Sequence, residues 1–118
     1  RSDIDVDVSP VRNPTFVTLS DGTIRNTYDL RLRNKTGAPR FFQISARADT
    51  PMRLTVEGLD GLFVQVPADG TLEARVYVDA VPGSVAATGA QTNLRLWIED
   101  PEGQDRVAHD THFNGTGG

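Results

Sequence analysis

Cysteine is absent from this chain of 118 residues, so it cannot form a disulfide framework, a thiolate zinc site or a cysteine-ligated iron–sulfur cluster. No apolar run approaches the roughly 20 residues that a membrane-spanning helix needs. No window of helical length repeats its apolar residues with the 3.6-residue period of an amphipathic helix. These absences leave a globular domain that folds by burying aliphatic side chains.

Basic charge is also scarce. The chain has 12 Lys and Arg residues against 16 Asp and Glu residues, a formal net charge of -4, and aromatic residues make up 7% of it. Residues 1–59 carry a net charge of +2 and residues 60–118 a net charge of -6, so all of the acidic excess lies in the second half. Binding of a nucleic acid needs a basic stripe with stacking aromatics, so we expect no nucleic-acid partner.

Apolar and polar residues alternate with period two along most of the chain, between turn signals rich in Gly, Pro, Asn and Asp. This pattern predicts β-strands at Ile4–Val8 with a continuation at Phe16–Leu19, and at Tyr28–Arg33, Phe41–Ala48, Met52–Val56, Phe63–Val66, Leu72–Val78, Leu94–Ile98 and Arg106–Phe113. A loop of small residues, 82–90, separates two of them, and the turn Asp100-Pro101-Glu102-Gly103 separates the last pair.

The fold class predicted from this pattern is all-β, an immunoglobulin-like β-sandwich of seven to nine antiparallel strands in two sheets. A small barrel is the structural alternative. We expect one domain over residues 1–118. Residues 1–8 are a leading strand or a linker, and the Gly-rich end, 114–118, is expected to fray.

The residues that could carry chemistry are few. His109 and His112 suit a copper or zinc ion, but positions i and i+3 of a strand point to opposite faces, so they share a metal only where a bulge intervenes. Asp3, Asp5 and Asp7 imitate the start of a calcium loop that then lacks its Gly and Glu. No G-x-S-x-G nucleophile turn, phosphate loop or carboxylate pair is present. The sequence predicts no enzyme activity and no resident cofactor.

Four residues are candidates for an interaction surface. Tyr77 and Trp97 fall on the polar phase of their strands, where large rings mark a docking surface unless a loop or the leading strand covers them. Arg31 and Arg33, with Lys35 and Arg40, could form a basic patch suited to an acidic partner or anionic headgroups. The alternative is that these charges protect an exposed sheet from aggregation.

One stretch carries a family resemblance. The sequence RNPTFVTLSDGTIRNTYDLRLRNKT, residues 12–36, resembles the opening of the C-terminal domain of the FixG/CcoG family, the cytochrome c oxidase accessory proteins. The shared elements are Arg12-Asn13-Pro14, Phe16-Val17, Leu19-Ser20-Asp21-Gly22, Ile24-Arg25-Asn26, Tyr28, Leu30, Leu32 and Asn34-Lys35-Thr36. Phe113-Asn114-Gly115 is similar to the F-x-G close of the family, although Thr116 stands where the family has Pro.

The resemblance implies a larger bacterial inner-membrane protein with several membrane helices, an iron–sulfur region and an immunoglobulin-like domain on the periplasmic side. Such proteins assist assembly of the cbb-type oxidase through copper reduction and delivery. It also implies that Asp21-Gly22 forms a turn, that Pro14 breaks the first strand and that Asn26 satisfies backbone groups where the next strand begins. The iron–sulfur clusters are expected in parts of the parent protein outside this chain.

The sequence and the resemblance together predict a non-catalytic interaction or stabilising domain. Its expected partners are the membrane region of its own parent protein, oxidase subunits and copper-handling proteins. Two alternatives stay open at this point: a copper-binding domain that uses His109 and His112, and a carbohydrate-binding or adhesive β-sandwich.

Overall fold

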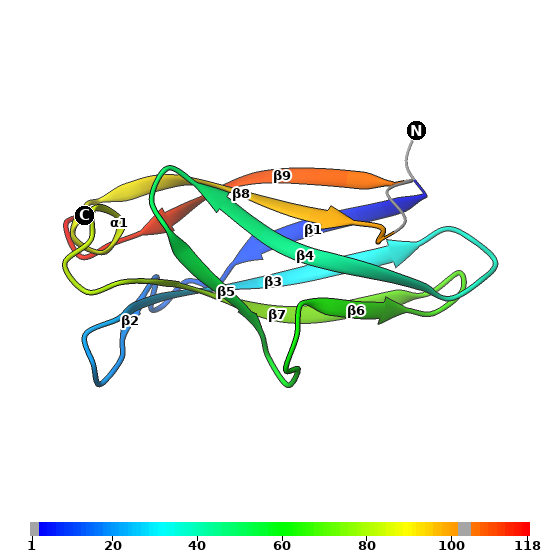
Figure 1. Ribbon diagram of the computed structural model, residues 1–118, viewed down its shortest axis with the longest axis horizontal. Helices are drawn as coiled ribbons and strands as arrows, with labels where there is room; N and C mark the ends of the chain where they lie inside the picture. Colours follow the sequence, from blue (N-terminus) through cyan, green and yellow to red (C-terminus); the bar gives the residue numbers. More distant parts are fainter. Residues whose placement is uncertain (1–2, 102–104) are drawn as a thin grey trace.

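The computed structural model describes residues 3–101 and 105–118, and these form two antiparallel sheets packed face to face (Figure 1). One sheet has the strand order β1-β3-β7-β5, with β2 also paired to β3, and the other has the order β6-β4-β8-β9. The elements are β1 (Ile4–Pro10), β2 (Val17–Thr18), β3 (Ile24–Asn34), β4 (Arg40–Ala48), β5 (Met52–Val56), β6 (Phe63–Val66), β7 (Thr71–Ala80), α1 (Val85–Thr88), β8 (Gln91–Glu99) and β9 (Arg106–Asn114). The predicted two-sheet immunoglobulin-like sandwich is confirmed. Among the described residues, no helix is long and apolar enough to cross a membrane.

The alternation along β3 fixes the register of its sheet. Tyr28, Leu30 and Leu32 are buried, whereas the residues between them face solvent. A slip of one residue would bury charged side chains, each at a cost of several kcal/mol. The inward side chains of both sheets meet in one core, whose largest members are Tyr28, Phe42, Phe113, Ile4, Leu30, Leu32, Ile44, Leu96 and Ile98.

The leading strand is interrupted as the sequence predicts. Pro10 of β1 lies opposite Tyr28, and Val17 of β2 lies opposite Arg25, so both strands pair with β3. The backbone leaves the sheet between them around the Asn13-Pro14 peptide, which is cis. Asp21-Gly22 forms the expected turn, in which Gly22 has a φ of 92° and its N–H donates to the carbonyl of Leu19 at 2.9 Å.

One loop differs from the prediction. The loop of small residues at 82–90 contains the one-turn helix α1, because the Ser84 hydroxyl accepts a hydrogen bond from the backbone N–H of Ala87 and caps its first turn. The predicted turn at 100–103 lies partly outside the described residues.

Two polar side chains of β3 hold the last strand. Asn26, only 2% exposed, donates to the carbonyl of Asn114 and accepts from its N–H, each at 2.8 Å. The Tyr28 hydroxyl donates to the carbonyl of His112 at 2.6 Å, and burial raises the pKa of this phenol well above its ordinary value. Asn26 therefore satisfies backbone groups, as the resemblance implies, but these groups belong to β9.

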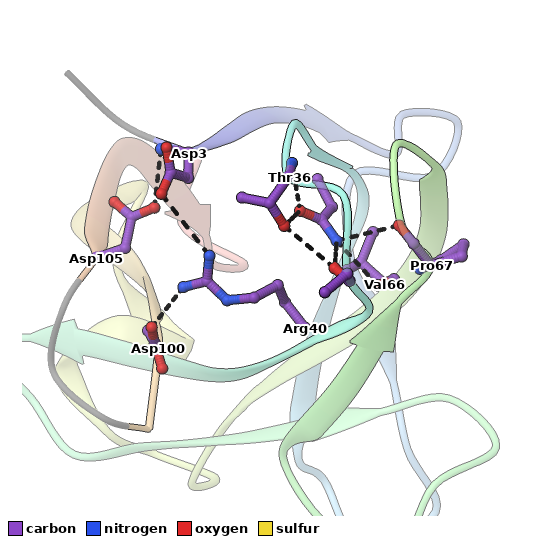
Figure 2. Close-up of polar contacts among 9 residues, drawn as sticks. Asp3, Thr36, Arg40, Val66, Pro67, Asp100 and Asp105 are labelled. Carbon is purple, nitrogen blue, oxygen red and sulfur yellow. Dashed lines mark hydrogen bonds and ion pairs between the residues drawn. The ribbon is translucent and has the colours of Figure 1, made fainter.

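Asn34 organises the loop that follows β3. Its amide donates to the carbonyls of Ala38 at 2.8 Å and Pro67 at 3.1 Å, and its oxygen accepts from the Thr36 N–H at 2.9 Å and hydroxyl at 2.7 Å (Figure 2). These contacts join the β3–β4 loop to the turn that follows β6. The Asn34-Lys35-Thr36 element thus shapes a corner of the sandwich.

The Gly-rich end, which is expected to fray, is tied to the segment around α1 (Figure 1). The backbone N–H groups of Gly115, Thr116 and Gly117 donate to the carbonyls of Ala90, Ala87 and Gly89 at 2.9–3.2 Å. A Cβ atom at residue 115 would clash with the carbonyl oxygens of this segment. Glycine is needed there because two stretches of backbone lie in close approach.

Candidate functional site

Two phenylalanine side chains lie on the outer face of the four-stranded sheet. Phe41 of β4 and Phe63 of β6 are 54% and 50% exposed, on the phase opposite to the buried residues of their strands. In the register of the two strands Phe63 faces Gln43 and Phe41 faces Gln65, so the rings are diagonal neighbours separated by uncharged amides. We call these four outward residues the Phe patch. Exposed aromatic rings with polar side chains around them are typical of interface centres.

An open groove of about 410 Å³ lies along one side of the patch. Its polar wall is the guanidinium of Arg40, which forms an ion pair with the buried Asp100 and lies 3.8 Å from the carboxylate of Asp3 (Figure 2). The backbone N–H of Asp3 in turn donates to Asp105 at 2.9 Å. Contacts among four segments therefore fix this end of the patch. The groove is lined by Pro39, Arg40, Phe41, Phe63, Asp100 and Pro101.

Tyr77 and Trp97, predicted to share an interaction surface, lie on different sheets. Tyr77 is on the outer face of β7, and Trp97 is on the outer face of β8. Both are half-buried, and neighbouring guanidinium groups cover their rings: Arg25 lies 4.5 Å from the Tyr77 centroid, and Arg106 lies 4.0 Å from that of Trp97. The structure does not bring the two rings together, and among the described residues the guanidinium groups that lie over them come from the neighbouring strands β3 and β9.

Arg31 and Arg33 lie on the same outer face of the five-stranded sheet as Tyr77, but further along the strands and among acidic residues. Across the register, Arg31 lies between Asp7 and Glu73, and Arg33 lies opposite Asp5. The Lys35 ammonium forms an ion pair with Asp5 at 3.1 Å, and Arg40 is held by the acids at the end of the groove. The four cations are thus interleaved with carboxylates. This arrangement does not form a concentrated basic patch for an anionic partner.

Paired charges continue along both outer faces. Arg75 forms two hydrogen bonds with Asp29, at 2.8 and 3.1 Å, and these lower the pKa of that carboxyl. Arg95 pairs with Asp110 in the same way and lowers its pKa. A hydrogen bond to Glu57 raises the pKa of the Tyr77 phenol. Exposed pairs of this kind contribute little stability, but they keep both sheet faces polar away from the Phe patch.

The two histidines stay apart. His109 is on the inward phase of β9, half-buried at the side of the sandwich, whereas His112 is exposed on the outward phase. Their opposite orientation follows from the three-residue spacing, because no bulge intervenes in the continuous β8–β9 register. Within residues 3–101 and 105–118, no group of three His, Asp or Glu side chains could hold a metal ion.

The sequence interpretation missed Phe41 and Phe63. Both lie out of step with the apolar residues of their strands, which is the signal that singled out Tyr77 and Trp97. Phe41 stands next to the buried Phe42, so the pair reads as a continuous apolar run in which either ring could face the core. The four-residue β6 is too short for its phase to be evident from the sequence.

Comparisons with known proteins identify the family. A sequence model of the family described as "IG-like fold at C-terminal of FixG" matches residues 1–116. Protein RdxB of Cereibacter sphaeroides is 53% identical over 117 residues, which are 99% of this chain and 24% of RdxB. Protein RdxA of the same organism is 47% identical over 118 residues, which are 98% of this chain and 25% of RdxA. The chain therefore spans about a quarter of the length of these relatives.

More distant relatives agree with this result. The nitrogen fixation protein FixG of Rhizobium meliloti is 29% identical over 119 residues, covering 97% of this chain and 22% of FixG. The crystal structure of a FixG-related protein from Vibrio parahaemolyticus superposes with a TM-score of 0.82 at 17% identity, covering 98% of this chain and 99% of that one. The latter similarity supports the fold. The chain belongs to the family of immunoglobulin-like domains found at the C-terminus of FixG.

Proposed function

We propose that this chain is a non-catalytic interaction domain that docks a protein partner through the Phe patch. The observation that carries the proposal is the exposure of about half of each ring of Phe41 and Phe63 on a sheet face whose other outward positions are largely polar or charged. Burying such rings in a partner releases water from apolar surface, with roughly 25 cal/mol gained per Å². The paired polar side chains around the patch would form the rim of the interface.

The wider setting rests on the family resemblance. We propose that the domain belongs to a membrane-bound iron–sulfur protein of the bacterial inner membrane, faces the periplasm and assists assembly of a cbb-type cytochrome c oxidase and its copper delivery. Its partner would be an oxidase subunit or a copper-handling protein, or the membrane region of its own parent protein. Membership of the FixG C-terminal family supports this setting.

The docking role is tested by Phe41→Ser and Phe63→Ser, singly and together, in the full-length protein that carries the domain. We expect the double variant to lower the amount of active oxidase in a strain that depends on that protein. Val85→Ser is the matched control, because Val85 is 72% exposed on α1 and lies outside the patch. Thermal unfolding of the purified domain should be unchanged in all variants. Normal oxidase levels in the double variant would contradict the proposal.

The periplasmic location is tested with one introduced thiol. The domain has no cysteine, and Gly37 is exposed, with open space within 4 Å of the position that a Cβ atom would take, so Gly37→Cys adds a single accessible thiol. A membrane-impermeant maleimide should label this variant in intact spheroplasts. The unsubstituted full-length protein gives the background from thiols elsewhere. Labelling that appears only after lysis would place the domain on the other side of the membrane.

A further inference from the structure

The strand β6 leaves one side of its backbone unpaired. It lies at the end of the order β6-β4-β8-β9 and pairs only with β4. The N–H of Ile44 donates to the carbonyl of Leu62 at 2.9 Å, and hydrogen-bonded pairs alternate along an antiparallel ladder. Phe63 and Gln65 are therefore the residues whose N–H and C=O groups point away from β4. No hydrogen bond from the described residues reaches these groups.

This edge also lacks the protection that the edges formed by β1, β5 and β9 have. The terminal strands β1, β5 and β9 carry charged residues, such as Asp7, Arg53 and Asp110, which discourage pairing with a foreign strand. The sequence of β6 is FVQV, without charge or proline. Its free edge runs directly beside the exposed Phe63 ring of the Phe patch.

Charge indicates what chemistry this edge would accept. Between Arg53 and Arg75 the chain has no basic residue, and two of its acidic residues, Asp60 and Asp69, flank β6. Asp60 lies in the loop before β6 and Asp69 in the turn after it, and both are exposed. A second copy of the chain would bring acidic ends against acidic ends, because antiparallel pairing places Asp60 of one copy near Asp69 of the other. Anionic lipid is disfavoured for the same reason.

We propose that an extended segment of a partner protein, with Lys or Arg alternating with apolar residues, adds as a strand to the free edge of β6. Its backbone pairs with Phe63 and Gln65, its apolar side chains pack on the Phe patch, and its cations lie near Asp60 and Asp69. This is strand addition, in which main-chain hydrogen bonds provide affinity and side-chain contacts provide specificity. The inference rests on the proposed docking function and specifies the partner and the geometry.

The test uses a short blocked peptide in which Val alternates with Lys, titrated into the ¹⁵N-labelled chain. We expect the amides of Phe63 and Gln65 to shift and to exchange more slowly with solvent. Gln65→Pro removes one edge N–H without touching the β4 ladder and should weaken binding about tenfold, whereas Gln65→Ala keeps that N–H and should bind nearly as well as the native chain. A peptide with Glu in place of every Lys should not bind.

Several results would overturn the inference. Equal affinity of Gln65→Pro and Gln65→Ala would exclude backbone pairing at this edge. Binding of the Glu peptide as strongly as the Lys peptide would exclude charge selection, and sedimentation as a dimer through β6 would assign the edge to a second copy. If Gln65→Pro folds poorly, amide exchange in the native chain still tests the proposal. Exchange at Phe63 and Gln65 that the Lys peptide does not slow would contradict strand addition. The Phe41→Ser, Phe63→Ser double variant could lose oxidase while the Lys peptide leaves amide exchange at Phe63 and Gln65 unchanged. That pair of results would support the docking function and exclude strand addition alone.

Discussion

The clamp between Asn26 and the last strand gives a quantitative prediction. Replacing Asn26 with Ala removes two hydrogen bonds of 2.8 Å and leaves the N–H and C=O of Asn114 without their partners. Unmet buried polar groups cost about 1–3 kcal/mol each, and because the site is only part-buried we expect a loss of about 2–3 kcal/mol in the free energy of unfolding. Unfolding entropy of about 2.1 cal/mol/K per residue gives about 0.25 kcal/mol/K for 118 residues, hence a fall in Tm of about 8–12 °C.

Urea denaturation and thermal unfolding of the purified chain measure both quantities. The matched control is Asn114→Ala, because the clamp uses the backbone of Asn114 and not its side chain. Among the described residues that side chain makes one hydrogen bond, an exposed contact with Gln91 at 3.3 Å, so we expect a change within about 0.5 kcal/mol. A loss below about 1 kcal/mol for Asn26→Ala, or an equal loss for Asn114→Ala, would refute the reasoning.

Three further predictions concern titration and packing. Because burial raises the pKa of Tyr28 above its ordinary value of 10.0, the phenol ionises first in the unfolded state, and the free energy of unfolding should fall above pH about 10. In urea denaturation, Tyr28→Phe should remove this alkaline loss and cost about 1–2 kcal/mol at pH 7. An unchanged alkaline slope in Tyr28→Phe would contradict this assignment. The hydrogen bond from Arg75 lowers the pKa of Asp29, so the stability that this pair contributes is present above the ordinary carboxyl pKa and is lost as pH falls through the lowered pKa. NMR titration of the Asp29 carboxyl should show a midpoint below 3.8, and this midpoint should rise in Arg75→Gln. Gly115→Ala should destabilise the domain by about 1–3 kcal/mol, because the new Cβ atom would clash with carbonyl oxygens. Gly37→Ala, whose Cβ atom would enter open space, should change stability by less than about 0.5 kcal/mol. Equal changes in Tm for the two variants would show that the backbone around residue 115 moves aside without cost.

The strands were predictable because each buries one face. Apolar residues alternate with polar ones at Tyr28, Leu30 and Leu32, and again at Val76 and Val78. This alternation indicates a strand face that must be apolar, and the structure places these residues in the core. The extents of β3 and β7 are longer than the sequence indicates. Polar residues such as Arg25 and Asp79 extend both strands, because an ion pair across the ladder at 2.8 Å continues the pairing after the apolar pattern has ended.

The docking surface was less predictable, because it depends on which strands become neighbours. Tyr77 and Trp97 satisfy the same out-of-phase criterion as Phe41 and Phe63, yet the first two are covered by arginine side chains from adjacent strands. Such cover depends on cross-strand register, which a single sequence does not specify. The role of Asn26 was hidden for the same reason, since its partner lies 88 residues further along the chain.

The reach of these contacts has a consequence for synthesis of the protein on the ribosome. Asn26 bonds to Asn114, 88 positions further along the chain, and Tyr28 bonds to His112, 84 positions further along. Both partners belong to β9, which completes the order β6-β4-β8-β9. A nascent chain that stops before this strand cannot close the sandwich and exposes its aliphatic side chains instead. We expect a chain that ends prematurely within β9 to be held by chaperones or degraded by proteases. The cell should therefore accumulate the folded domain but no truncated form of it.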